Sequence, residues 1–120
     1  MRIVTASLAT ALTFTLLCAT ASAQDGFRRI ETAQQFQDAV VGKTLRAGET
    51  YVEVRRNRKL TGKINGEPFT GAWEWRGAYF CRTIKLTHKN TDCQLWEVNG
   101  NQHSITRDKG TGKRVIYVAD

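Results

Sequence analysis

The sequence predicts a mainly β (α+β) fold, in which a short N-terminal helix precedes a roughly seven-stranded antiparallel meander that forms a small barrel or sandwich with one disulfide. Three observations predict it. Helical spacing of apolar residues occurs once, early in the chain. After Gly42 the period changes to two, in short runs separated by turn signals such as Asn65-Gly66. Two of these runs contain Cys81 and Cys93.

The first 23 residues have the pattern of an export signal. A basic start and an apolar stretch lead to Ala21-Ser22-Ala23, the small-x-small pattern that a signal peptidase accepts. A membrane span needs about 20 predominantly apolar residues, and this stretch is shorter and rich in Thr. We therefore predict cleavage between Ala23 and Gln24 and a periplasmic or secreted protein; the alternative is a retained N-terminal anchor. The mature chain, residues 24–120, is expected to be a single small β-rich domain without a transmembrane segment.

Cleavage would leave two cysteines in an oxidising compartment, where a disulfide persists. Cys81 and Cys93 are separated by eleven residues, unlike the two that separate a redox-active C-x-x-C pair. We predict a structural disulfide that stabilises the fold by about 3 kcal/mol.

The single predicted helix covers residues 33–41. Thr32 has the character of an N-cap, and Gln35 stands three residues later, as in a capping box. An apolar stripe that we expect to cover a core is formed by Phe36, Ala39 and Val40. Gly42 ends the helix. The segment before it, 24–30, is polar and predicted to be loose.

The strands follow one another at short, regular intervals. They are predicted at 51–54, 59–64, 69–76, 78–86, 93–98, 102–106 and 114–118. Turns are expected at Asn57-Arg58, Asn65-Gly66, Gly77, Asn99-Gly100 and 108–112, and the polar segment 85–92 predicts a loop. In the third strand, Phe69, Gly71, Trp73 and Trp75 share one face.

Positive charge and aromatic residues are the two chemical biases of the chain. The formal net charge is +7, with one basic cluster at Arg55, Arg56, Arg58, Lys59 and Lys63 and another at Arg107, Lys109, Lys113 and Arg114. Such clusters are either solvated hairpin tips or sites for phosphates, sulfated sugars or acidic lipid headgroups. No nucleic acid is expected, because no recognition helix or RNA-platform motif is present. The aromatic residues Trp73, Trp75, Tyr79, Phe80 and Trp96 either pack a core or line a pocket, for which Trp73 and Trp75 are the preferred place.

No catalytic, metal or cofactor site emerges from the sequence, which favours a non-enzymatic protein. His88 and His103 are isolated from each other and from motif partners. The segment Gly110-Thr111-Gly112-Lys113 resembles a phosphate loop superficially, but the spacing of its glycines is wrong and a strand follows where a helix is needed.

Three motifs carry a resemblance to a known family. They are Trp73-x-Trp75 followed by Tyr79-Phe80-Cys81-Arg82, the second-cysteine segment Asp92–Val98, and Asp108-Lys109-Gly110-Thr111-Gly112. Over most of residues 30–119 the chain resembles a family of small exported alphaproteobacterial proteins of unknown function. The resemblance implies the same fold and compartment, and no catalytic residue. Some members carry the label dihydrodipicolinate reductase, but this chain has no G-x-G-x-x-G loop, no paired His and no room for a second domain.

The function predicted from these observations is a non-enzymatic binding module for an anionic or amphipathic envelope ligand. The predicted contacts are Tyr51, Arg55, Trp73, Trp75 and Arg82, with arginines for charge and aromatic rings for apolar surface. A protein-interaction or inhibitor module is the alternative, and a reductase is disfavoured. An aromatic cup rimmed by Arg would favour ligand capture.

Overall fold

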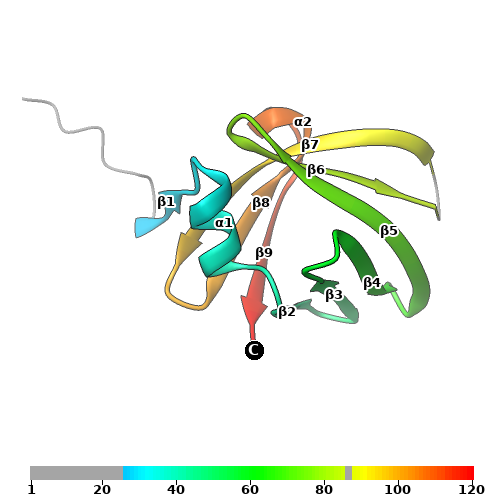
Figure 1. Ribbon diagram of the computed structural model, residues 1–120. Coiled ribbons are helices and arrows are strands. Elements are labelled where there is room, and N and C mark those ends of the chain that lie inside the picture. The colour runs from blue at the N-terminus through cyan, green and yellow to red at the C-terminus, as the bar shows by residue number, and fades with distance from the viewer. Residues whose placement is uncertain (1–25, 86–87) are drawn as a thin grey trace, which may run out of the picture.

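The structure is a computed structural model that describes residues 26–85 and 88–120 (Figure 1). The predicted signal peptide, residues 1–23, and its cleavage site lie outside this part of the chain. In chain order the elements are β1 (Arg28–Arg29), α1 (Ala33–Ala39), β2 (Thr44–Ala47), β3 (Thr50–Val54), β4 (Lys59–Ile64), β5 (Glu67–Arg76), β6 (Tyr79–Ile84), β7 (His88–Asn99), β8 (Gln102–Thr106), α2 (Arg107–Gly110) and β9 (Arg114–Ala119). Neither described helix has the length and apolar composition of a transmembrane helix.

The strands form a closed antiparallel barrel, as the sequence predicts in outline. Around the ring the order is β7-β6-β5-β4-β3-β2-β9-β8, and pairing between β7 and β8 closes it; β1 adds to β7. Seven of these contacts join strands that follow each other in the sequence. The eighth, between β2 and β9, joins Arg46 to Val118, which lie far apart in the chain. Of the two predicted architectures, the protein therefore adopts the barrel.

The structure has more strands than the sequence predicts. β2 is four residues long, too short to show alternation, and it becomes a strand because β3 and β9 pair with its two edges. The predicted loop at 85–92 is wrong over its second half, since β7 begins at His88 and its Asp92 pairs with Arg82 of β6. Polar composition misled the prediction, because cross-strand pairing can hold a polar segment extended.

The segment before the helix is ordered from residue 26 on, so the prediction of a loose segment is wrong there. Phe27 and Ile30 are both 3% exposed. Between them β1 pairs with β7, and the Ile30 amide donates to the Trp96 carbonyl at 2.9 Å. Two buried apolar side chains fix this short segment against the barrel.

The predicted helix cap and most of the predicted turns are present in the structure. Thr32 and Gln35 form the capping box in both directions. Asn65 and Gly66 have φ of 49° and 83°, the left-handed pair that a tight hairpin turn requires. The later turn is shifted by one residue, to Gly100-Asn101, because Asn99 pairs with Gln102. α1 ends at Ala39, two residues earlier than predicted.

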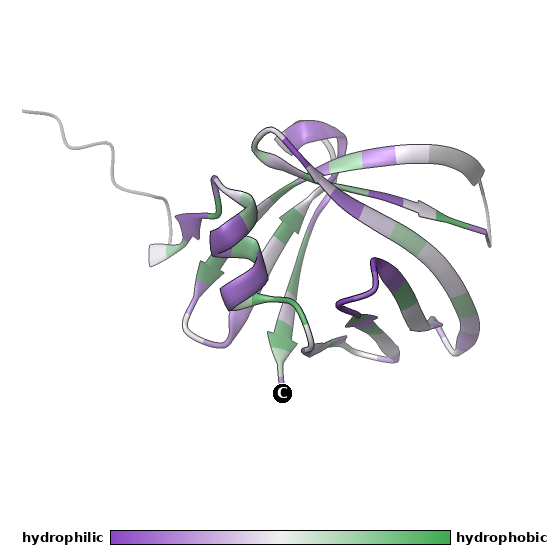
Figure 2. Cartoon of the chain, in the orientation of Figure 1, coloured by the Kyte–Doolittle hydropathy of each residue, from purple (hydrophilic) through white to green (hydrophobic). Residues whose placement is uncertain are grey.

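α1 is mostly hydrophilic and inserts one aromatic ring into the barrel core (Figure 2). Phe36 is 1% exposed. Its ring lies 5.1 to 5.2 Å, centroid to centroid, from those of Trp73, Trp75, Phe80 and Trp96. The predicted role of the helix as a cover for the core is confirmed.

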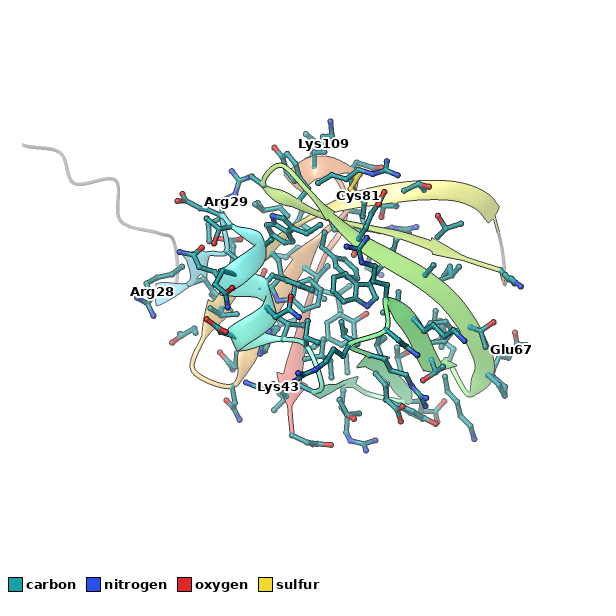
Figure 3. The ribbon with its side chains drawn as sticks, viewed as in Figure 1. Arg28, Arg29, Lys43, Glu67, Cys81 and Lys109 are labelled. Carbon is teal, nitrogen blue, oxygen red and sulfur yellow. A yellow bond between two sulfur atoms is a disulfide. The ribbon has the colours of Figure 1, made fainter. Side chains whose placement is uncertain are left out.

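The predicted disulfide joins Cys81 of β6 to Cys93 of β7 (Figure 3). The two residues are direct cross-strand partners with a Cα–Cα distance of 4.0 Å. Because side chains alternate along a strand, the neighbours of both cysteines point to the other face of the sheet, toward the barrel interior. A structural disulfide fits a protein that works in an oxidising compartment.

Candidate functional site

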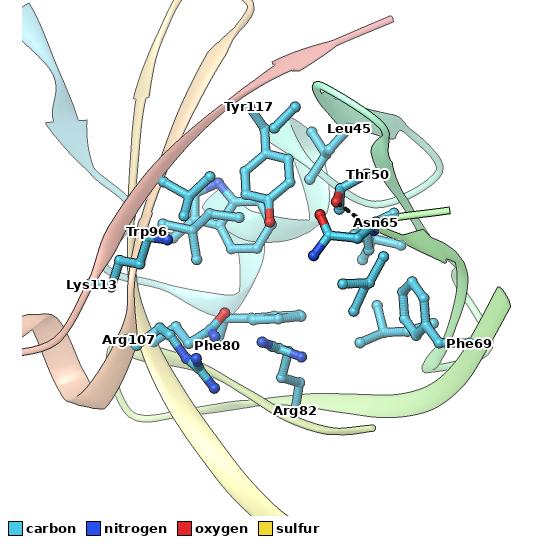
Figure 4. A pocket seen from close by; sticks show the side chains of 18 residues that line it. Leu45, Thr50, Asn65, Phe69, Phe80, Arg82, Trp96, Arg107, Lys113 and Tyr117 are labelled. Atoms are coloured by element: carbon cyan, nitrogen blue, oxygen red, sulfur yellow. Dashed lines mark hydrogen bonds between the residues drawn. The ribbon is translucent and has the colours of Figure 1, made fainter. Parts of the chain in front are cut away.

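The barrel holds a cavity of about 410 Å³, which we call the cup (Figure 4). Phe80 and Trp96 line it, and both contact Phe36, so these two rings separate α1 from the cup. Further apolar wall is provided by Leu45, Val52, Val54, Leu60, Ile64, Phe69, Ile105 and Val115. The volume lies within the range usual for sites that bind small molecules.

One side of the cup is cationic. It is lined by Arg82 of β6, Arg107 of α2 and Lys113, which directly precedes β9, together with the polar side chains of Asn65 and Tyr117 (Figure 4). Arg107 and Lys113 are exposed at the mouth, whereas Arg82 is partly buried. No Asp or Glu is among the described residues that line the cup. The cup therefore combines an apolar interior with a cationic wall.

Arg82 is the most unusual side chain of the cup. Its guanidinium makes no hydrogen bond or ion pair within 4.0 Å to any residue that the structure describes. Burial lowers the pKa of Arg82; the charge of Asp92 partly opposes this, and the like charge of Arg107 adds to it. Arginine stays protonated in proteins, so a charged group with unused donors lies beside apolar walls.

The Asp92 carboxylate accepts hydrogen bonds beside the cationic side of the cup. The donors are Gln94 Nε2 at 2.7 Å, the Asp108 backbone N–H at 3.1 Å and Arg107 Nε at 3.4 Å. Burial works against the charge of Asp92, but these hydrogen bonds and the nearby Arg82 outweigh it and hold the pKa of the carboxyl below its ordinary value. Asp92 thereby orients Arg107 through its Nε atom.

The α2 turn holds the two mouth cations close together. The Arg107 amide donates to the Lys113 carbonyl at 3.1 Å, and the Gly112 amide donates to the Arg107 carbonyl at 2.9 Å. Between them, Asp108 and Lys109 adopt left-handed conformations with φ of 52° and 54°. A Cβ atom at Gly112 would lie 3.1 Å from the Arg107 carbonyl oxygen and 2.7 Å from Asp108 Oδ2, at the end of a flexible side chain, so the turn leaves little room for a side chain there.

The structure places one of the five predicted contact residues in the cup, Arg82. Trp73 and Trp75 pack against Phe36 instead, and Trp73 Nε1 donates to the Arg55 carbonyl at 2.9 Å. The Arg55 side chain bonds to its neighbours Glu53 and Thr61. Tyr51 lies under the guanidinium of Arg46, at 5.4 Å.

Several residues of the cup were visible in the sequence only as members of larger groups. Phe80 and Trp96 belong to the aromatic set, and Arg107 and Lys113 to the second basic cluster. Asn65 was singled out only as a turn residue, and Tyr117 carried no signal of its own. Alternation places Phe80 with Arg82 and Asp92 with Gln94 on common faces, but it does not tell which face becomes the interior.

A buried histidine lies in the wall near the cup. His103 is 1% exposed, and its Nδ1 atom accepts a hydrogen bond from Trp96 Nε1 at 3.0 Å. Burial, helped by the positive charge of Lys43, lowers the pKa of His103 to about 4. The residue is therefore neutral at pH 7 and serves as a hydrogen-bond acceptor for Trp96.

We expect His103 to make the protein less stable in mild acid. An unfolded histidine has a pKa of about 6.5, so below this pH the unfolded chain binds a proton that the folded chain refuses. The free energy of unfolding should fall as the pH drops below about 6.5, by about 2 kcal/mol at about pH 5, and level off below about pH 4. Urea unfolding at several pH values measures this loss. The His103→Gln variant should lack this part of the pH dependence; identical slopes for variant and wild type would contradict the assignment.

In the described part of the chain, no group of three or more His, Cys, Asp or Glu side chains is placed to hold a metal ion. Comparison with protein-family models, curated proteins and solved structures gives no match to this chain. The resemblance to the exported alphaproteobacterial family therefore stays a prediction.

Proposed function

We propose that the protein is a binding module for a small amphipathic anion, which occupies the cup. The apolar part of the ligand would lie against Phe80 and Trp96, and its acidic group would bind Arg82. The observation that carries this proposal is the guanidinium of Arg82, which lies in an apolar cavity with its donors unused.

The energetics favour an anion over a neutral ligand. The Arg82 guanidinium has no partner among the described residues, and its nitrogens reach solvent beside apolar walls. An anion that binds there gains charge-assisted hydrogen bonds that a neutral ligand does not offer. Hydrogen bonds to charged groups contribute about 1.5–3 kcal/mol each when the partner arrives. Burial of the apolar part adds about 25 cal/mol for every Å² removed from water.

We further propose that the protein works in the periplasm or outside the cell, after removal of residues 1–23. The disulfide supports this location, because it would be reduced in the cytosol. An amphipathic anion of the cell envelope is then the ligand class within reach. A protein partner and an enzymatic role stay without support from a specific contact.

The Arg82→Met variant tests the proposal. Methionine fills similar space and removes the charge, so we expect decanoate to bind at least about tenfold more weakly in isothermal titration calorimetry. The free energy of unfolding should be unchanged or higher, because an unpaired cation has been taken out of the barrel.

Arg56→Met is the matched control, since Arg56 lies exposed on the β3–β4 turn, away from the cup. It should leave decanoate binding unchanged. Equal decanoate affinity in Arg82→Met and wild type, or no saturable binding of any anionic amphiphile to the wild type, would refute the proposal.

A further inference from the structure

We infer that the acidic group preferred by the cup is a doubly charged phosphate monoester rather than a carboxylate. This inference rests on the proposed function and narrows it. The geometry that points to it is the presence of three cations, Arg82, Arg107 and Lys113, in the lining of a cavity that no described acidic residue lines (Figure 4).

The net positive charge of the cup favours a dianion over a monoanion. Within the described residues, Asp92 is the one carboxylate in an ion pair with a cation of the cup, at 3.4 Å from Arg107. The three cations and this carboxylate leave a formal excess of two positive charges at the mouth. A carboxylate would neutralise half of that excess. A phosphate monoester carries a charge of about −1.5 to −2 at pH 7 and would neutralise nearly all of it.

The number of hydrogen-bond donors in the cup also favours a phosphate group. Arg107 uses its Nε atom on Asp92, so its terminal nitrogens make no bond to a described residue. Arg82 donates to no residue that the structure describes, and Lys113 adds an ammonium group. The guanidinium groups of Arg82 and Arg107 both lie close enough to the Tyr117 hydroxyl for their charges to favour its ionised form. A phosphate monoester offers three terminal oxygens to this set of donors, whereas a carboxylate offers two.

The segments that carry the three cations are held in place by hydrogen bonds. Asp92 fixes Arg107 and the Asp108 amide, and the tight α2 turn fixes Lys113 relative to Arg107. Arg82 is held by the β6–β7 pairing next to the disulfide. The backbone at all three cations and the side chain of Arg107 are thus fixed before the ligand binds, which reduces the entropy lost on binding. We therefore assign the side chain of Lys113 to the phosphate site, although the segment 110–113 is not a nucleotide-binding loop.

Three amphiphiles with the same apolar chain separate charge from shape. Decyl phosphate is a dianion with three terminal oxygens, decyl sulfate is a monoanion with the same tetrahedral shape, and undecanoate, whose alkyl part is also a decyl chain, is a monoanion with a planar acidic group. In calorimetry at about pH 7.5, we expect decyl phosphate to bind at least about tenfold more tightly than either monoanion. Affinities equal within about threefold for all three would overturn the inference and leave the proposed function standing. Absence of saturable binding for all three would overturn the proposed function itself.

The Lys113→Gln variant gives an independent readout. It should weaken decyl phosphate binding by at least about fivefold and decanoate binding by less than about twofold. Lys109→Gln, in the same turn but outside the cup, is the matched control and should change neither affinity. Thermal unfolding confirms that each variant is folded. A loss of equal size for both ligands, or no loss for either, would contradict the assignment of Lys113 to a phosphate group.

Discussion

Replacing Phe36 with alanine should lower the free energy of unfolding by about 4 kcal/mol. Phe36 is 1% exposed and touches four other aromatic rings. Its removal loses the burial of a large apolar side chain, leaves a cavity and breaks favourable ring contacts. Since small domains have total stabilities of about 5–15 kcal/mol, the variant should be close to unfolding at room temperature. Urea titration followed by near-ultraviolet circular dichroism measures the effect.

The Gln37→Ala variant is the control for this experiment. Gln37 is the next residue in α1, is exposed, and does not belong to the hydrophobic core. Its substitution should change stability by less than about 0.5 kcal/mol. If Phe36→Ala cost no more than Gln37→Ala, the helix could not be a required cover of the core.

Removing the disulfide with the double substitution Cys81→Ala and Cys93→Ala should lower the free energy of unfolding by about 3 kcal/mol. The crosslink closes a short loop between β6 and β7 and restricts the unfolded chain. Reduction of the wild-type protein should give a similar loss. Both are measured by urea unfolding with and without reductant, and reductant should have no effect on the double variant.

A non-covalent pair on the same two strands provides the control. The hydroxyls of Thr83 and Thr91 lie 2.8 Å apart across β6 and β7. Changing both to alanine should cost about 1 kcal/mol, because an exposed hydrogen bond contributes little. A disulfide removal that cost no more than this pair would contradict the role of the crosslink as the main staple of the hairpin.

These two stabilising features also support the cup. Phe36 backs the rings of Phe80 and Trp96 on the side away from the cavity. The disulfide lies between cup residues on both of its strands, with Phe80 and Arg82 flanking one cysteine and Gln94 flanking the other. The position of Arg82 therefore depends on the same contacts that stabilise the barrel.

The sequence by itself determined the features that depend on neighbouring residues. The capping box at Thr32 and Gln35, the left-handed turn at Asn65-Gly66 and the alternation along β5 are local, because each needs only a few adjacent side chains. The disulfide was also predictable, since only two of the three cysteines lie in the predicted mature chain, and these two allow one intramolecular pairing.

Only the tertiary structure decided the closure of the barrel and the contents of the cup. The pairing of β2 with β9 joins segments more than 70 residues apart and leaves no local pattern, as the Arg46–Asp120 ion pair at a separation of 74 illustrates. Alternation divides each strand into two faces, but the curl of the sheet chooses which face lies inside. That choice turns Arg82 inward beside Phe80 and leaves Arg55 on an exposed turn, although the two arginines look alike in the sequence.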